Sequence, residues 1–200
     1  RYRSSAASDV YKRQALGLDG VKEVCPFLAG RMTAGPGKSR ILDYGPVKEV
    51  KLIGAAADLR KLPIPIHSDG DAGRYLGSGV TITRDPETGI RNESILRTQL
   101  TDNPHKAPFW MAARHNYQHF LKYKAAGEPM PMAFAIGLHP VYEIMSNWSG
   151  LHPDFDELEY AAGILGETLE LVQCETIDLE VPAHAEIVIE GLVHPEEELP

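Results

Sequence analysis

The sequence predicts an α+β fold built on a mostly antiparallel sheet or barrel. Short apolar or β-branched runs bounded by Gly and Pro recur along the chain, and such runs are typical of strands. Two stretches with three- and four-residue spacing predict helices between these strands. A strand–turn–strand unit near the middle is the clearest local feature and favours antiparallel pairing. With 200 residues, the chain has room for one domain and part of a second.

Composition excludes several classes of function. The chain has 20 Lys and Arg against 28 Asp and Glu, a net charge of −8, and no basic stripe that would bind a nucleic acid. The longest apolar stretch, 132–138, is far shorter than the ~20 residues of a membrane span. Cys25 and Cys174 form no metal or redox motif, so we expect a cytoplasmic protein with Cys174 as a small core residue.

Residues 1–14 are interpreted as a non-native tail. They read RYRSSAASDVYKRQ, have no core periodicity and resemble translated sequencing-adaptor DNA. The alternative is a frayed native terminus. The tail predicts that the protein is a fragment whose N-terminal side is open.

The pattern between residues 15 and 58 is less decisive. The runs 21–29 and 47–57 each fit either a strand or a helix, because periodicity does not decide at this length. The string 35–39 (Gly-Pro-Gly-Lys-Ser) is similar to part of a phosphate-binding loop, but the Walker pattern requires glycine at the position of Met32. We therefore predict an ordinary loop at 35–39.

The next stretch contains the clearest local structure. Two prolines within 61–66 push their predecessors into extended geometry, so this segment is predicted to be a linker or an edge segment. The β-branched run 80–83 predicts a strand, and 85–89 (Asp-Pro-Glu-Thr-Gly) predicts a turn. A second strand is predicted over 90–100.

The second half of the chain alternates helices and strands. The spacing predicts a helix over 107–126, ended by Gly127. Trp110 and Trp148 are expected to be core or interface anchors. The remaining predicted elements are a buried strand over 132–137, a helix over 156–165, and strands over 169–176 and 185–193.

Three polar stretches contain the candidate chemistry, and the first is 91–97 (Arg-Asn-Glu-Ser-Ile-Leu-Arg). It places amide, hydroxyl and guanidinium groups on a strand that should be apolar on one face. Buried polar groups need partners, so a polar ligand would explain them. A solvated edge strand explains them equally well.

The second stretch contains His115 and His119, which share one helix face at a spacing able to hold a metal. Asn116 stands where zinc proteases have Glu, so a small metal hydrolase would need a third ligand from elsewhere. Packing against the sheet or a cofactor is the expected role of His119. The third stretch, 154–159, has four acidic residues; such runs usually complement a helix dipole, but one inward carboxylate would suit a hard cation.

In this order and with these flanks, the three stretches resemble the UbiD family of decarboxylases that use prenylated FMN. The resemblance runs from about residue 59 to residue 200 and depends on five pieces that occur in the same order. The pieces are Leu62-Pro63-Ile64-Pro65, 85–89 with Arg91-Asn92, Ser94-Ile95-Leu96-Arg97, 127–131 (Gly-Glu-Pro-Met-Pro), and 174–183 leading into 185–191.

The resemblance implies a metal and cofactor site. At the matching positions, Asn92, His115 and Glu157 would hold a manganese ion that grips the cofactor phosphate. Glu159 is the alternative to Glu157, because the alignment there can slip. An amide oxygen, a carboxylate and one imidazole suit manganese, and potassium is an additional candidate. The implied flavin contacts also include Ser94, Ile95, Leu96, Arg97 and Arg114.

Arg97 is the candidate catalytic residue. It matches the arginine that the family places beside the substrate carboxylate, where a planar two-donor fork fits the geometry. A regular strand would send Asn92 and Arg97 to opposite faces, so a bulge or an edge-on cofactor is required.

The resemblance implies a flavin-reductase-like split β-barrel over 59–200, preceded by the remnant of an α/β domain over 15–58, in a homo-oligomeric parent. The implied reaction is the reversible, non-oxidative decarboxylation of an aromatic or α,β-unsaturated acid, with the flavin as electron sink. The glutamate pair of the family's Glu-Gly-Pro-Phe-Gly-Glu stretch is not in this sequence. We therefore expect a missing C-terminal domain and an inactive chain. The alternative is a flavin-binding module without lyase activity.

Overall fold

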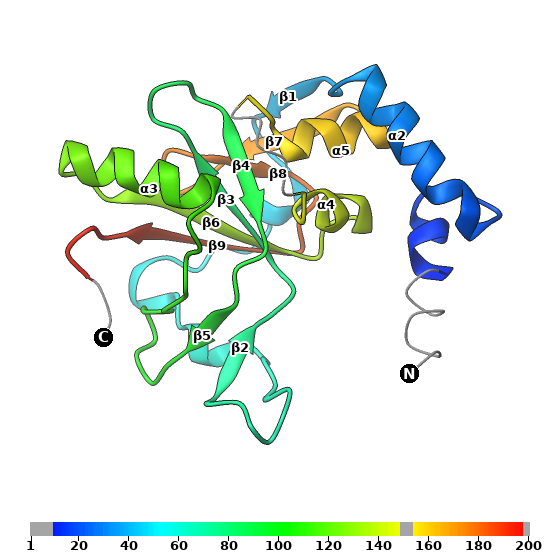
Figure 1. The fold of residues 1–200 in the computed structure, drawn as a ribbon. Helices are drawn as coiled ribbons and strands as arrows, with labels where there is room; N and C mark the ends of the chain where they lie inside the picture. Colours follow the sequence, from blue (N-terminus) through cyan, green and yellow to red (C-terminus); the bar gives the residue numbers. More distant parts are fainter. Residues whose placement is uncertain (1–9, 149–153, 198–200) are drawn as a thin grey trace.

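The computed structural model describes residues 10–148 and 154–197, and its centre is a four-stranded antiparallel sheet (Figure 1). In spatial order the strands are β4 (Arg91–Ser94), β3 (Val80–Arg84), β6 (Met130–Ile136) and β9 (Ile187–Val193). The register places Thr83 opposite Asn92. Strand β4 is therefore an edge strand with the inner strand β3 beside it.

Two smaller sheets complete the strand pairing. Strand β1 (Ser39–Leu42) runs parallel to β7 (Leu169–Gln173), which pairs with β8 (Glu180–Pro182). Strand β2 (Arg74–Leu76) pairs antiparallel with β5 (Thr98–Leu100). Among the residues described, no pairing joins these sheets into a closed barrel. The predicted α+β class is confirmed, whereas the split barrel stays a prediction.

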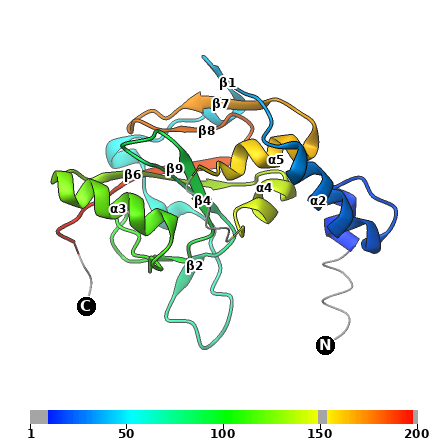
Figure 2. The ribbon, with the colours of Figure 1, turned by 45° about the horizontal axis from the view of Figure 1, so that its top comes forward.

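Helices cover the two faces of the central sheet differently (Figures 1 and 2). Helix α3 (His115–Ala126) packs on β3, β4 and β6. Helix α5 (Glu157–Leu165) packs on β4 and β7 and against α4 (Pro140–Met145) and α2 (Val24–Ala34). Because side chains alternate along a strand, β4 turns one set of residues toward α3 and the next set toward α5.

The main apolar core lies between the central sheet, α5 and the β7–β8 sheet. Ile82, Leu158, Leu171 and Leu179 are each at most 1% exposed in this cluster. Removing apolar surface from water contributes about 25 cal/mol per Å², so this cluster is the main stabilising feature. Cys174 belongs to it, as predicted, and burial raises the pKa of its thiol.

The loop before β1 approaches α5 closely. The amide of Gly37 donates to the carbonyl of Glu159 at 2.7 Å. A Cβ added at Gly163 would lie 2.7 Å from the carbonyl oxygen of Gly35 and 2.9 Å from the nitrogen of Gly37. The loop predicted at 35–39 is thus a packing element up to the start of β1, with helix backbone rather than an anion against it.

The strand predicted over 90–100 is wrong, because it is two strands in different sheets. Strand β4 ends at Ser94 in the central sheet, and β5 begins at Thr98 in the sheet with β2. The two strands have different partners, so the connection between them turns the chain. Asn92 and Arg97 do not share one regular strand, and the expected conflict over their faces disappears.

The helix predicted over 107–126 begins only at His115. Pro108 disfavours helical geometry in the residue before it, and the backbone of Phe109 forms a bridge with β5 instead. The predicted end is confirmed, since Gly127 closes the helix in the left-handed region with φ 72°.

Several shorter elements differ from expectation or escaped it. The run 21–29 is helical, in η1 (Val21–Glu23) and α2. The run 47–57 contains neither a strand nor an α-helix, because glycine and proline divide it into single turns. These turns are η2 (Pro46–Lys48) and η3 (Gly54–Ala56), and η4 (Leu59–Lys61) follows. Strands β1 and β8 and helix α4 are too short to show a periodicity.

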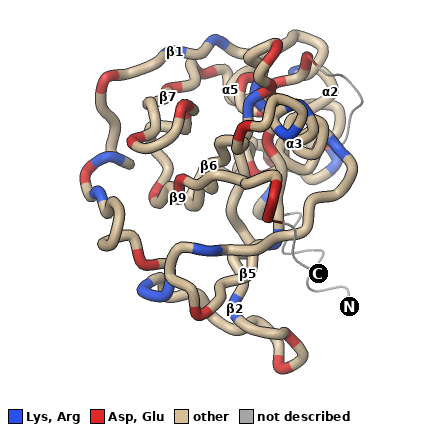
Figure 3. Tube along the Cα trace, turned by 90° about the vertical axis from the view of Figure 1, so that its left-hand side faces the viewer, with Lys and Arg blue, Asp and Glu red and all other residues tan. Residues whose placement is uncertain are grey.

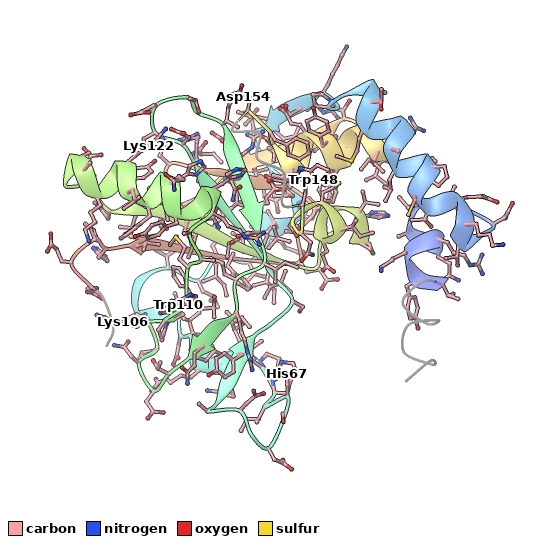
Figure 4. The ribbon with its side chains drawn as sticks, in the orientation of Figure 1. His67, Lys106, Trp110, Lys122, Trp148 and Asp154 are labelled. Atoms are coloured by element: carbon pink, nitrogen blue, oxygen red, sulfur yellow. The ribbon has the colours of Figure 1, made fainter. Side chains whose placement is uncertain are left out.

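The two tryptophans differ in environment (Figure 4). Trp110, in the segment before α3, is 85% exposed, so of its two predicted roles the one in the core is wrong and the one at an interface stays a prediction. Trp148 stacks on Phe155 with ring centroids 5.7 Å apart and is 43% exposed. Pro108 and the bridge at Phe109 keep the Trp110 segment extended and outside the packed face of α3.

Charge and hydropathy in the described part of the chain agree with the composition. Acidic and basic residues intersperse along the trace (Figure 3), and no continuous basic stripe is visible among the residues drawn. No helix in the described ranges is both long and apolar enough to cross a bilayer.

One carboxyl group lies in the interior of the fold on the α5 side of β4. Glu93 is 2% exposed, and neither of its oxygens has a hydrogen-bond partner among the described residues. Burial raises the pKa of Glu93 well above its usual range, and the carboxylates of Asp156 and Glu157 raise it further, against the opposing charge of Arg91. The folded state therefore favours the protonated form of Glu93.

The close approach at Gly163 predicts opposite effects for two helical Gly→Ala substitutions. Gly163→Ala should lower the free energy of unfolding by about 1–3 kcal/mol, because its Cβ meets backbone atoms. Gly30→Ala in α2 should raise it by up to about 1 kcal/mol, because nothing lies within 4 Å of that Cβ. Urea unfolding measures both, and equal effects would contradict the packing of this loop on α5.

The buried carboxyl predicts that Glu93→Gln stabilises the chain at pH 8 and changes little at pH 4. The folded chain keeps a proton that the unfolded chain releases near its ordinary pKa of about 4.3, so wild-type stability falls as pH rises above that value. Glutamine has a similar shape and no charge. Urea unfolding in a chelator at both pH values tests this, and an equal gain at both would contradict a protonated Glu93.

Candidate functional site

Asn92 and His115, two of the three predicted metal ligands, lie together. Oδ1 of Asn92 is 3.1 Å from Nδ1 of His115. Asn92 is the second residue of β4 and His115 is the first residue of α3, so the helix start brings the imidazole onto the sheet face. Asn92 is 5% exposed and His115 is half-buried, so the pair lies at the border between the interior and solvent.

A buried polar network holds Asn92 from behind. Nδ2 of Asn92 donates to Oδ1 of Asn116, which also accepts from the hydroxyl of Thr83 at 2.8 Å. Nδ2 of Asn116 donates to Oγ of Ser94 at 2.6 Å. Asn116 and Thr83 are 4% and 0% exposed, so these protein groups are the partners that satisfy them.

His119 belongs to this network and not to a metal cluster. Its Nδ1 lies 2.9 Å from Oγ1 of Thr83, and its Nε2 lies 3.9 Å from a carboxylate oxygen of Asp85. Burial lowers the pKa of His119 to about 4, so the ring is neutral near pH 7. Asp85 instead pairs at 2.6 Å with Lys122, which is labelled on α3 in Figure 4. The expectation that His119 packs against the sheet is confirmed.

The hydrolase alternative required a third ligand near His115 and His119. Within residues 10–148 and 154–197, no three His, Cys, Asp or Glu side chains converge in a way that could hold a metal ion. The metal hydrolase is therefore not supported. This result does not concern the predicted ligand set of Asn92, His115 and Glu157, because one of its ligating atoms is an asparagine oxygen.

Glu157 reaches the same strand from α5. Its Oε2 accepts from the backbone amide of Glu93 at 2.9 Å, one residue beyond Asn92. Glu157 is 1% exposed, and burial raises the pKa of its carboxyl to about 8. The N-terminus of α5 is set by Asp156, whose carboxylate accepts from the amide of Glu159 at 3.0 Å.

Glu159, the alternative ligand, has a separate environment. One of its oxygens accepts from the hydroxyl of Ser39 at 2.7 Å and lies 3.5 Å from a guanidinium nitrogen of Arg91. That guanidinium also pairs with Asp156 at 2.8 Å and with Glu180 at 3.5 Å. Ser39, Arg91, Asp156 and Glu159 line a polar cavity of about 330 Å³ that Asp154, labelled in Figure 4, also borders. Glu159 is thus engaged by Ser39 and Arg91, and none of its described contacts is with Asn92.

Arg97 lies in the turn between β4 and β5. Its guanidinium pairs with Asp71 at 2.5 Å and stacks over the ring of Tyr75 with 4.3 Å to the centroid. The Arg97 side chain is 62% exposed, whereas Asp71 is 15% exposed. Among the described contacts, none joins Arg97 to Asn92. Asp71 and Tyr75 hold the guanidinium, and most of the Arg97 side chain stays accessible to solvent.

The remaining predicted cofactor contacts surround these groups. Ser94, Ile95 and Leu96 are half-buried at the end of β4 and in the turn that follows. Arg114 is exposed and is the residue just before α3, with its carbonyl accepting from the amide of Gln118 at 3.0 Å. Ser94, Ile95 and Leu96 thus lie where the chain leaves β4, which contains Asn92. Arg114 lies where the chain enters α3, which begins with His115.

Sequence reasoning missed four residues of this arrangement. In the sequence, Asn116 stands out only as a departure from a zinc-protease motif, and Thr83 only as a β-branched strand former. Asp71 and Tyr75 belong to no recognisable motif. The one available signal was the polar pattern of β3, where Thr81 and Thr83 alternate with apolar residues on a strand that is buried on both faces.

The chain matches known proteins over most of its length. A family model described as UbiD, the 3-octaprenyl-4-hydroxybenzoate carboxy-lyase Rift-related domain, matches residues 40–200. A curated relative, the anhydromevalonate phosphate decarboxylase of Methanothermobacter thermautotrophicus, is 39% identical over 137 residues, which are 68% of this chain and 32% of the relative. The chain spans about a third of the length of the curated relatives it matches.

Solved structures agree with this match. An evolved dimeric form of the UbiD-class enzyme HmfF from Pelotomaculum thermopropionicum, in complex with prFMN, superposes with a TM-score of 0.84 and 42% identity, covering 92% of this chain and 43% of that chain. The 3,4-dihydroxybenzoic acid decarboxylase of Klebsiella pneumoniae has a TM-score of 0.82 and 26% identity, covering 92% and 39%. With the family model matching well over half of the sequence, the chain belongs to the UbiD family.

Proposed function

We propose that the parent of this chain is a decarboxylase that uses prenylated FMN to remove CO₂, reversibly and without net oxidation, from an aromatic or α,β-unsaturated acid. Membership of the UbiD family supports this, as do the decarboxylases among the relatives and the HmfF structure with prFMN. The observation that carries the proposal is the approach of the Asn92 oxygen to the His115 ring at 3.1 Å. Two unlike ligating atoms converge there, one from a buried and one from a half-buried side chain.

Asn92, His115 and Glu157 are the proposed ligands of a divalent cation, with manganese as the expected ion and potassium as a further candidate. An amide oxygen, an imidazole and a carboxylate form a donor set that manganese accepts. Glu157 is anchored to β4 one residue beyond Asn92, which supports its choice over Glu159. A cation would also offset the negative charge that burial makes unfavourable at Glu157.

Ser94, Ile95, Leu96, Arg97 and Arg114 are the proposed further contacts of the flavin. When bound, prenylated FMN supplies the electron sink that no side chain provides. The chain's part is to orient: Ser94 is fixed through Asn116, and the turn after it sets the direction of Arg97. Burial of the network behind Ser94 keeps water away from that side.

Arg97 is the proposed contact for the substrate carboxylate. Asp71 engages one guanidinium nitrogen, and Tyr75 supports the plane of the group from one side. The remaining donors of a guanidinium can form a two-point contact with a carboxylate. Asp71 thus orients Arg97 without using all of its donors.

The domain scheme stays a proposal: a tail at 1–14, an α/β remnant at 15–58 and a flavin-binding split barrel at 59–200. The barrel is supported by the central sheet and the β1–β7–β8 sheet, which pack around one core, while Leu76 of β2 and Leu100 of β5 pack on Phe134 of β6 in a smaller cluster. A homo-oligomeric parent is supported by the dimeric form of HmfF. The free cysteines Cys25 and Cys174 are consistent with the cytoplasmic location we propose.

The proposed site predicts that the chain binds Mn²⁺ in the presence of FMN and that two ligand variants lose this binding. Asn92→Ala and Glu157→Ala should each weaken Mn²⁺ affinity by about 10-fold or more, since each removes a donor to the cation. Loss of the free-ion signal in electron paramagnetic resonance titrations measures bound Mn²⁺. The matched control is Glu159→Ala, which removes a nearby carboxylate with structural contacts and should bind as wild type does. A larger loss in Glu159→Ala than in Glu157→Ala would contradict the ligand assignment.

The chain as printed is predicted to form no product. The glutamate pair expected to move protons is not in this sequence, and the carboxylate that engages Arg97 is Asp71. After reconstitution with prenylated FMN and Mn²⁺, CO₂ release from aromatic and cinnamate-type acids should not exceed the protein-free rate. Turnover close to that of a full-length relative would contradict this and would make Asp71 a candidate for the missing proton carrier.

A further inference from the structure

The carboxamide of Asn92 can be turned in two ways, and only one of them serves a cation. In the structure its oxygen faces His115 and its nitrogen faces Asn116. Rotation by half a turn would exchange them and present N–H donors to the cation site. Because an amide nitrogen does not ligate a hard cation, something must select the orientation.

The selection can be followed through the hydrogen bonds behind Asn92. Oδ1 of Asn116 is an acceptor only, and it lies 2.8 Å from the hydroxyl of Thr83. Thr83 has a single hydroxyl proton, so that proton is donated to Asn116. Nδ1 of His119, 2.9 Å from the same hydroxyl oxygen, must then carry a proton and donate it to Thr83.

The reverse direction would also satisfy each of these groups. If Nδ1 of His119 accepted, Thr83 would donate to it, and Asn116 would have to turn its nitrogen toward Thr83. Asn92 would then turn its own oxygen toward Asn116 and its nitrogen toward His115. The position of one proton on His119 therefore corresponds to the orientation of Asn92, three residues further along the network.

We propose that Asn116, with Thr83 and His119, is a positioning unit that turns the carboxamide oxygen of Asn92 toward the cation. This rests on the proposed role of Asn92 as a ligand. None of its three residues is among the proposed contacts of the cation or the flavin, and the unit acts on the cation through Asn92. It also sets Ser94, to whose hydroxyl Asn116 donates at 2.6 Å.

Burial and charge both support a fixed direction. Thr83, Asn116 and His119 are 0%, 4% and 7% exposed, so water cannot replace a lost partner, and a broken bond leaves an unsatisfied buried group. Asp85 would favour a proton on Nε2 of His119, but it lies 3.9 Å away and is paired with Lys122 at 2.6 Å. Lys122 thereby weakens the effect of the Asp85 charge, which favours the reverse direction.

The first test needs no metal or cofactor. Nitrogen-15 NMR of the metal-free chain at pH 7 should show His119 protonated at Nδ1 and unprotonated at Nε2. The His119 signals are identified by their disappearance in His119→Asn. A proton on Nε2 would overturn the proposed direction, whether or not the chain binds a cation.

The second test measures Mn²⁺ affinity with FMN present in three variants of β3. Thr83→Val keeps the shape but removes the hydroxyl, and it should weaken Mn²⁺ binding about 10-fold or more. Thr83→Ser keeps the hydroxyl and should bind close to wild type. The matched control is Thr81→Val, equally buried on the same strand. The Thr81 hydroxyl donates to the carbonyl of Ser94 at 2.7 Å and lies 3.0 Å from the Ser94 hydroxyl and 3.4 Å from Nδ2 of Asn116. This variant keeps the link from His119 through Thr83 and Asn116 to Asn92, so it should bind Mn²⁺ close to wild type.

The variants also distinguish a failure of the positioning role from a failure of the cation site itself. A loss of Mn²⁺ binding in Asn92→Ala without a loss in Thr83→Val would overturn the positioning role alone. Equal binding by wild type and Asn92→Ala would overturn the cation site and the positioning role with it. Equal losses in Thr83→Val and Thr81→Val would show a general packing effect and would also overturn the proposal; unfolding in urea confirms that the two are equally stable.

Discussion

Strand β4 is buried on both faces although it contains polar and charged residues, and the arrangement around it follows from this constraint. A buried polar group without a partner costs about 1–3 kcal/mol, so the neighbouring elements must supply partners. On one face α3 supplies Asn116 for Asn92 and Ser94. At the free edge of β4, α5 supplies the carboxylate of Glu157 for the backbone amide of Glu93, whereas the buried carboxyl oxygens of Glu93 have no partner among the described residues. Both helices are thereby fixed against the same four residues.

The elements with a clear local signal could be predicted from the sequence. The turn at 85–89, the strand at 80–83, the end of α3 at Gly127 and the course of α5 depend on nearby residues, and the structure has them. The break between β4 and β5 could not be predicted, because it depends on which distant strand each half pairs with. The start of α3 was misplaced for a related reason, since a bridge to β5 competes with the helix at Phe109.

The candidate ligands could be predicted from the sequence, but the residues that hold them in place could not. Asn92 and His115 were identified by resemblance, and the structure places them 3.1 Å apart, while their role stays a proposal. Thr83 and Asn116 look unremarkable in the sequence, because a threonine on a strand and an asparagine on a helix have ordinary roles in most proteins. Only the register of β3 on β4, which sets Thr83 opposite Asn92, shows that the two belong to one network. The same holds for Asp71, because its ion pair with Arg97 depends on the turn that brings Arg97 close to it.

The contact between Glu157 and the amide of Glu93 has a second consequence, for self-association. Strand β4 is at the edge of its sheet, and an exposed edge is a template onto which a strand of another molecule can add. A side chain from α5 occupies the outward N–H group of Glu93, at the position that such a strand would use. The same carboxylate thus blocks one of the backbone groups to which a strand of another molecule would bind.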